Sequence, residues 1–160
     1  MHNKLVLWGH HVNEYRDMFD LSESDLNDRL LEYGCGPSAI NAELNGFRHQ
    51  VISCDPLFDF PLPFVDFAFD LALSANYLFS ALNDQDVELH LRVLRELARV
   101  AKEVRVYPLE SQGLISPMLG PVLLGLQHDN FGVEVRQVDH PLPSTGNAML
   151  RVWAQQCQVG

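Results

Sequence analysis

The sequence predicts a three-layer α/β domain with a mostly parallel, doubly wound sheet and an antiparallel hairpin at its carboxyl end. Three observations lead to this fold class. Residues 29–55 read as a strand, a glycine turn, a helix and a second strand that ends on Asp55. Residues 84–102 show the period of an amphipathic helix. Residues 133–138 and 148–153 alternate as two strands with turn residues between them.

The 160 residues are expected to form a single domain, with a helical segment at 1–28 and an α/β core at 29–155. The 47% of hydrophobic residues and 20% of charged residues indicate a packed core rather than a disordered chain. The formal net charge of -10 repels phosphates, so we expect no nucleic acid and no membrane surface as a partner and favour a small-molecule substrate. No stretch reads as a signal peptide or a transmembrane helix, and we therefore expect a cytoplasmic protein.

The cysteines and histidines indicate neither a disulfide framework nor a metal site. The cysteines, Cys35, Cys54 and Cys157, are odd in number and scattered, with no C-x-x-C pair. A reducing compartment fits such a set. His10 and His11 are adjacent rather than helically spaced, which is typical of surface or capping histidines.

The amino-terminal segment is predicted to be helical. Residues 12–19 indicate a short helix whose apolar face includes Tyr15. Residues 22–25 are typical of a cap, and a second short helix is expected at 25–29. Two arrangements fit this segment. The first helix either packs on the sheet or forms a lid over a ligand, with Tyr15 or His11 reaching the site.

The turn after the first strand predicts a nucleotide-like ligand. Gly34 and Gly36 allow a sharp bend and a close approach to the backbone. Pro37 suits the first position of a helix, whose free N–H groups and partial positive charge face the turn. Asp55 ends the next strand and can accept two hydrogen bonds from a ribose diol. The alternative is a plain strand–helix–strand turn with a solvated Asp55.

Glu32 separates two classes of ligand. Gly34-x-Gly36-x-x-Ala39 matches the loose dinucleotide pattern, which would make the chain an NAD-dependent oxidoreductase. Glu32 would bring an anion close to a pyrophosphate, however, and it suits a ligand with a positive end. Here the sequence resembles the class I S-adenosylmethionine-dependent methyltransferases, whose first motif is an acid, any residue, Gly, any residue, Gly. In that family the acid faces the methionine portion of the cofactor, and a second acid, here Asp55, holds the ribose.

The middle of the chain resembles the family but is shorter. Residues 62–70, with Leu-Pro-Phe, an acid and Phe-Asp, lead into the apolar strand 71–74, as in the family's approach to its fourth strand. The preceding segment, 56–69, is rich in proline and phenylalanine and too short for the family's third strand with its helix. We infer that this strand is absent, which leaves 49–54 as an exposed sheet edge. The phenylalanines of 56–69 could plug the core, form a dimer surface or stack on adenine.

The carboxyl-terminal half completes the sheet. Residues 84–102 predict the longest helix and 104–108 the strand that follows it. A further helix is expected to start at Ser116 and to end at Gly132. The last two strands then form the hairpin. Such a hairpin on a parallel sheet resembles the methyltransferase fold more than the dehydrogenase fold, and the sheet order expected in family numbering is 2-1-4-5-7-6.

The resemblance implies S-adenosylmethionine as the cofactor and methyl transfer to an unidentified small-molecule acceptor. The residues expected to hold the cofactor are Tyr15, Glu32, Tyr33, Gly34, Cys35, Gly36, Asp55, Pro56, Ser74, Ala75 and Asn76. No catalytic residue is identified, and His10, His11 and Tyr77 are candidates for a general base. The alternative is a catalytically inactive methyltransferase-like module that binds a ligand or forms a homodimer through the exposed edge or the 56–69 segment.

Overall fold

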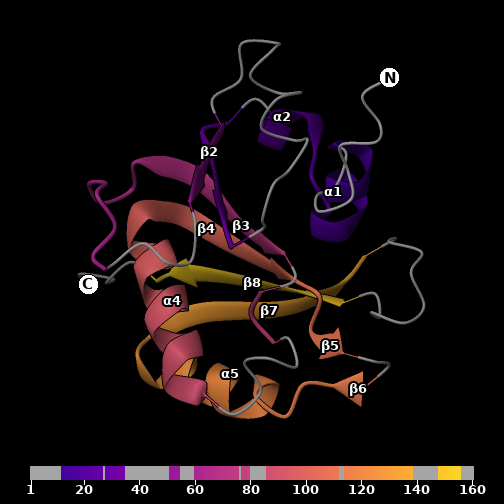
Figure 1. The fold of residues 1–160 in the computed structure, drawn as a ribbon, viewed down its shortest axis with the longest axis vertical. Coiled ribbons are helices and arrows are strands. Elements are labelled where there is room, and N and C mark those ends of the chain that lie inside the picture. Colours follow the sequence, from indigo (N-terminus) through magenta and orange to yellow (C-terminus); the bar gives the residue numbers. More distant parts are fainter. Residues whose placement is uncertain are drawn as a thin grey trace.

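A six-stranded sheet lies at the centre of the molecule (Figure 1). The computed structural model describes residues 12–26, 28–34, 51–54, 60–75, 77–79, 86–111, 114–138 and 148–155. The strands of the sheet are β1 (Leu30–Tyr33), β2 (Val51–Cys54), β3 (Phe69–Ala75), β4 (Ala101–Tyr107), β7 (Phe131–Gln137) and β8 (Ala148–Ala154). They lie in the order β2-β1-β3-β4-β8-β7, and only the β4–β8 and β8–β7 pairs are antiparallel. The predicted order 2-1-4-5-7-6 and the closing hairpin are therefore confirmed.

Helices cover both faces of the sheet (Figure 1). The described helices are α1 (Val12–Phe19), α2 (Glu23–Leu26), α4 (Val87–Val100) and α5 (Leu119–His128). Apolar residues of α1 and α2 form one buried cluster with one face of the sheet, and those of α4 and α5 form a second cluster with the other face. The molecule thus has the three layers that the sequence predicts. None of the described helices is long and apolar enough to cross a membrane.

The first helix has the predicted bounds, whereas the second begins earlier than expected. The main-chain N–H of Asp25 donates to Ser22 Oγ at 3.0 Å, and the N–H of Ser22 donates to Asp25 Oδ2 at 2.9 Å. This reciprocal pair caps a helix that begins at Glu23. The predicted bounds of 25–29 are wrong, because Ser22 is the cap and the helix therefore begins at Glu23, while Arg29 lies outside it.

α1 packs on the sheet as a core element. Tyr15 and Phe19 are fully buried, and their rings meet edge to face with centroids 5.4 Å apart. Phe19 also contacts Tyr107 of β4 with ring centroids 6.5 Å apart. Leu71 and Leu73 of β3 complete this side of the core. Of the two arrangements considered for the segment, the described residues show the one in which the helix packs on the sheet.

The longest helix is shorter at both ends than the sequence suggests. Asp86 caps α4, and its Oδ1 accepts a hydrogen bond of 2.9 Å from the N–H of Leu89. The helix ends at Val100, because Ala101 has the extended backbone of a strand. Ala101 and Lys102 were expected in the helix and belong instead to β4. The apolar spacing continues through Ala101, so it predicts a helix beyond Val100, where the backbone becomes extended.

The expectation that Gly132 ends the next helix is wrong. α5 ends at His128, and Asn130, with a φ of 68°, turns the chain into β7. Gly132 lies within β7 against the indole ring of Trp153, so close that a Cβ on it would overlap the ring. The lack of a side chain at Gly132 therefore leaves room for the Trp153 ring of the neighbouring strand, and Gly132 does not end a helix.

Two very short strands were not predicted. β5 (Glu110–Ser111) and β6 (Leu114–Ile115) form an antiparallel pair directly after β4. Strands of this length give no usable alternation in sequence. Leu114 and Ile115 of this hairpin are exposed.

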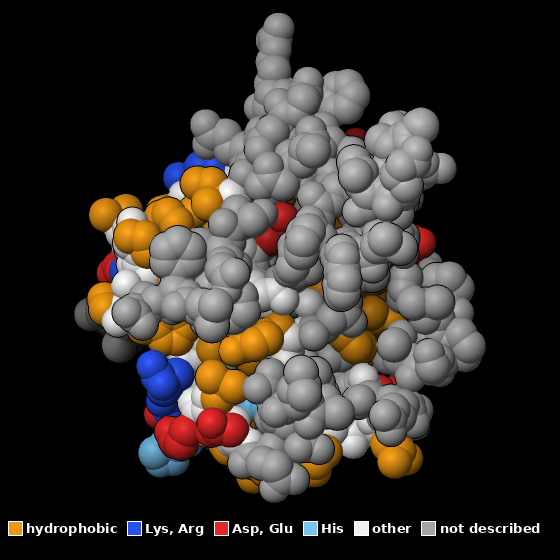
Figure 2. All heavy atoms as spheres, in the orientation of Figure 1, with side chains coloured by type: hydrophobic (Ala, Val, Ile, Leu, Met, Phe, Trp, Pro, Cys, Tyr) orange, Lys and Arg blue, Asp and Glu red, His pale blue; other side chains and the backbone are white. Residues whose placement is uncertain are grey.

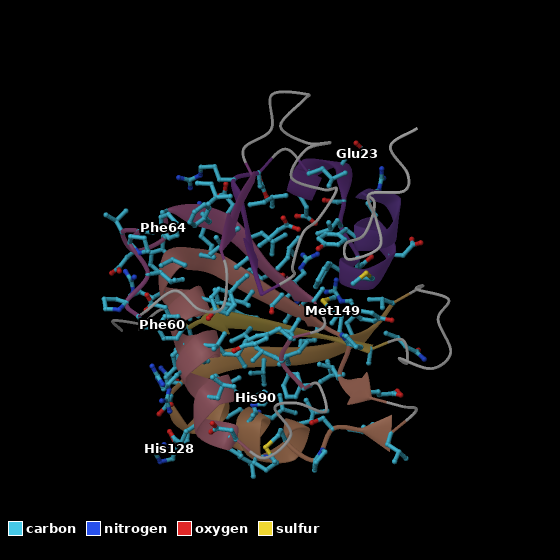
Figure 3. All side chains as sticks on the ribbon, viewed as in Figure 1. Glu23, Phe60, Phe64, His90, His128 and Met149 are labelled. Carbon is cyan, nitrogen blue, oxygen red and sulfur yellow. The ribbon has the colours of Figure 1, made fainter. Side chains whose placement is uncertain are left out.

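No strand occurs among residues 60–68, and β2 lies at the edge of the sheet. Phe60 and Phe64 pack against the core beside α4, as Figure 3 shows, and the Phe64 ring meets Phe69 edge to face at 4.9 Å. The core-plug interpretation is therefore confirmed for these two rings. Phe67 is exposed instead. Figure 2 shows hydrophobic side chains gathered at the left of the surface, the side on which Figure 1 draws the 60–68 segment.

Arg99 of α4 fastens this segment. Its guanidinium group donates to the carbonyl oxygens of Leu62 at 3.2 Å and Phe64 at 3.0 Å, and to the carboxylates of Asp66 and Glu96. Glu96 in turn accepts a hydrogen bond of 2.5 Å from the N–H of Leu62. These bonds satisfy main-chain groups of Leu62 and Phe64 in a segment that forms no strand or helix.

Candidate functional site

The strand order creates a switch point between β1 and β3. The chain passes from β1 to β2 in one direction, and from β2 it returns across β1 to reach β3 on the other side. In open α/β sheets, crossovers that diverge in this way leave a crevice outside the carboxyl ends of the two strands, where ligands bind. The residues at these two strand ends are therefore the first candidates for a site.

Glu32 and Gly34 lie at the carboxyl end of β1. Glu32 pairs in register with Leu73 of β3 and is only 1% exposed. Strand alternation places its side chain on the face of Leu71 and Leu73, which is the face that α1 covers. Gly34 follows with a φ of 70°, a left-handed conformation that favours glycine. A buried carboxylate next to a backbone turn suits a ligand that brings a positive group.

Tyr33, Ser74 and Ala75 also lie at the carboxyl ends of β1 and β3. Ser74 and Ala75 end β3 and pair in register with Val106 and Tyr107 of β4. Ser74 is fully buried, and its Oγ makes no hydrogen bond with the part of the chain that the structure describes. Tyr33 is buried on the α4 side of the sheet. The described cofactor candidates on β1 and β3 therefore end at the same edge of the sheet, with Glu32 and Ala75 on the α1 face and Tyr33 and Ser74 on the α4 face.

The turn at 77–79 lies beside Gly34 at the carboxyl end of β1. The Tyr77 ring lies against Gly34, where a Cβ would be 2.9 Å from Tyr77 Cγ, and it meets the Tyr33 ring edge to face at 5.9 Å. The N–H of Phe79 donates to Nε2 of His90 at 2.9 Å. Burial raises the pKa of the Tyr77 hydroxyl above its usual value near 10. Tyr77 is therefore a protonated phenol at neutral pH.

Several predicted residues lie outside the described ranges. These are Cys35, Gly36, Asp55, Pro56 and Asn76, together with the candidate bases His10 and His11. Tyr15 is described, and it lies inside the cluster between α1 and the sheet.

A partly buried ion-pair network lies on the α1 face of the sheet, and none of its members is among the predicted site residues. Arg105 of β4 donates to the carbonyl oxygens of Phe19 at 2.7 Å and Asp20 at 3.0 Å, and to Glu103 at 2.6 Å. Arg151 of β8 donates twice to Glu103, at 2.8 and 3.0 Å. Burial alone would raise the pKa of Glu103, but the hydrogen bonds from the two arginines outweigh it, and the pKa lies below its usual value. The sequence contains one signal for this network, because Arg105 is a charged residue between Val104 and Val106 of a buried strand.

The comparisons with known proteins show the fold. No protein-family model matches the sequence, and no curated protein is significantly similar to it. The solved structure of WbdD with the kinase inhibitor LY294002 is similar with a TM-score of 0.54 and 13% identity over 82% of this chain. This chain spans only 37% of the WbdD chain. A SAM-dependent methyltransferase from Methanosarcina mazei is similar with a TM-score of 0.50 and 13% identity, over 92% of this chain and 100% of that one. The chain thus has a class I methyltransferase-like fold.

Proposed function

We propose that this chain is an S-adenosylmethionine-dependent methyltransferase that acts on a small-molecule acceptor. The observation that carries the proposal is the position of Glu32 and Gly34. A buried carboxylate and a left-handed glycine lie together at the switch point of a methyltransferase-like sheet. Ligands of open α/β sheets bind at this position.

The residues present fit this cofactor in their chemistry. The Glu32 carboxylate, which is buried at the end of β1, would accept a charge-assisted hydrogen bond from the methionine ammonium group. Gly34 would allow the cofactor to approach the backbone, and Asp55 would hold the ribose hydroxyls. Ser74, whose buried hydroxyl makes no hydrogen bond with the described residues, would offer that hydroxyl to the ligand.

The chemistry that the bound cofactor supplies is a methyl carbon on a sulfonium ion, from which the acceptor takes the methyl group while the C–S electron pair stays on sulfur. The protein has to bring the acceptor atom in line with that bond, and positioning supplies most of the rate. Ala75 ends β3 at the switch point, so residues 74–76 would lie beside the acceptor. Burial raises the pKa of Tyr77, so its hydroxyl is protonated at neutral pH and would act as a hydrogen-bond donor.

A second candidate function is an inactive methyltransferase-like module that binds a ligand or dimerises. The observation that favours it is the position of β2, which pairs with β1 alone among the described strands. β2 is the edge strand, its Ile52 is 44% exposed, and its sequence contains no proline or charge that would discourage pairing. This function predicts a concentration-dependent dimer without turnover, which sedimentation analysis and a methyl-transfer assay distinguish from the first.

The experiment is calorimetric titration with S-adenosylmethionine, S-adenosylhomocysteine and NAD. We expect binding of the first two with a Kd on the order of micromolar and no binding of NAD. Glu32→Gln and Asp55→Ala should each weaken binding at least about tenfold, because each removes a charge-assisted hydrogen bond. Glu88→Gln, at an exposed position of α4, is the matched control. An unchanged affinity in Glu32→Gln, or tight binding of NAD alone, would contradict the proposal.

A further inference from the structure

His90 is a buried polar side chain to which the proposed function assigns no part. It lies near the amino-terminal end of α4 and is 0% exposed (Figure 3). Its Nε2 accepts a hydrogen bond of 2.9 Å from the N–H of Phe79, and its Nδ1 lies 2.7 Å from the carbonyl oxygen of Asp86. A carbonyl can only accept and an N–H can only donate, so these partners assign a neutral imidazole with its proton on Nδ1.

This imidazole holds the 77–79 turn in a conformation that the turn would not favour alone. Phe79 has a φ of 60°, which is strained for a bulky residue. Its ring packs on the imidazole ring with centroids 4.8 Å apart, and its N–H is satisfied by Nε2. The turn is therefore fixed to α4 by one hydrogen bond and one ring contact with the same residue.

The same turn sets the position of Tyr77 at the candidate site. Tyr77 lies two residues before Phe79, and its ring packs on Gly34 and against Tyr33. A continuous series of contacts thus runs from α4 through Phe79 to the glycine turn of β1. If the Phe79 hydrogen bond were lost, the ring contact with His90 would be left to hold the turn in its strained conformation.

We propose that His90 is a positioning residue, which acts through the Phe79 N–H to hold the Tyr77 ring as a wall of the switch-point site. The acceptor at Nε2 carries this role, whereas the donor at Nδ1 only satisfies the Asp86 carbonyl. The identity of the ligand rests on the function proposed above, but the placement of Tyr77 does not.

The test compares two substitutions that separate the two ring nitrogens. His90→Gln keeps an acceptor near the position of Nε2, because its amide lies at that distance along the side chain. His90→Asn keeps a donor near the position of Nδ1 and has no group that reaches Phe79. We expect His90→Gln to retain affinity for S-adenosylhomocysteine, and His90→Asn to lose at least about tenfold, the range expected when a buried donor is left without its partner.

A second readout does not depend on the ligand. The nuclear Overhauser effect between the Gly34 α-protons and the Tyr77 ring reports the packing directly, and it should persist in His90→Gln and disappear in His90→Asn. If the wild type binds no S-adenosylhomocysteine, the proposed function fails while this effect still tests His90. Equal behaviour of the two variants in both readouts would overturn the role of His90. If both variants fail to fold, Tyr77→Leu removes the ring itself, and unchanged ligand affinity in that variant would also overturn the proposal.

Discussion

Arg105 in the middle of the sheet donates a hydrogen bond of 2.7 Å to the main-chain carbonyl of Phe19, the last residue of α1. The same guanidinium group reaches the carbonyl of Asp20 at 3.0 Å, and it is only 7% exposed. The last carbonyl groups of a helix lack partners within the helix, so a buried arginine that satisfies them joins α1 to the sheet. The amino-terminal segment is therefore fastened by charge as well as by apolar packing.

Arg105→Met should be strongly destabilising. It removes the donor to two buried carbonyls and leaves Glu103 with fewer partners, and we expect the free energy of unfolding to fall by about 2–4 kcal/mol. Urea denaturation followed by circular dichroism measures this loss. The control is Arg16→Gln, which breaks the exposed Arg16–Glu23 pair and should change stability by less than about 1 kcal/mol. Equal losses in the two variants would show that Arg105 is no more important than a surface arginine.

Arg99→Gln should release the 60–68 segment from α4. Gln cannot make the four contacts of the guanidinium group with Leu62, Phe64, Asp66 and Glu96. We expect a loss of about 1–3 kcal/mol in unfolding free energy and faster proteolysis within 60–68. Arg95→Gln is the matched control on the same helix. It breaks the pair with Asp129, the residue after α5, and should leave proteolysis of the segment unchanged. Unchanged cleavage in Arg99→Gln would contradict the clamp.

Gly132→Ala and Gly120→Ala should have opposite effects. A Cβ at Gly132 would overlap the Trp153 ring, and we expect a loss of about 1–3 kcal/mol with altered tryptophan fluorescence. A Cβ at Gly120, within α5, would meet nothing within 4 Å. Alanine there should stabilise the protein by about 0.5–1 kcal/mol, because it restricts the unfolded chain. Thermal unfolding of the two variants checks both signs, and a stable Gly132→Ala would disprove the ring contact.

The contribution of Asp70 to stability should depend on pH. Hydrogen bonds from Arg29, at 3.0 to 3.2 Å, lower the pKa of Asp70 well below its usual value, and Lys102 lies 3.2 Å away. The pKa of Asp70 is lower in the folded than in the unfolded protein, where it is about 3.9. Such a carboxylate contributes its full stabilisation at pH values above about 3.9. The contribution is lost as the pH falls from about 3.9 toward the folded-state pKa. The stability gap between wild type and Asp70→Asn should therefore be constant from pH 7 to 5 and shrink below about pH 4. Urea denaturation at each pH measures the gap, and a gap that does not change would refute this assignment.

Much of the fold could be predicted because local pattern and chain order are enough for it. The glycine turn, the apolar strand 71–74 and the alternating final strands each give a signal within a few residues, and connection rules then fix their order. Helix ends were less predictable. The bounds of α2, the strand position of Ala101 and the role of Gly132 depend on reciprocal capping, extended backbone and ring packing, and none of these follows from the hydrophobic period alone.

The candidate site could be predicted in part for the same reason. Glu32 and Gly34 are neighbours along the chain, so the motif that contains them can be recognised from the order of residues alone. His90 and Arg105 act on main-chain groups that are distant in sequence, at Phe79 and Phe19. A main-chain partner leaves no trace in the sequence, and such contacts become apparent only in three dimensions.

The most direct test of the central claim is an amide chemical-shift map of the protein titrated with S-adenosylhomocysteine. Binding at the switch point predicts that the largest shifts fall on residues 32–34 at the end of β1 and on residues 73–79, with α5 and the β7 edge unaffected. Shifts confined to other surfaces, or none at millimolar ligand with the fold intact, would contradict a cofactor site between β1 and β3.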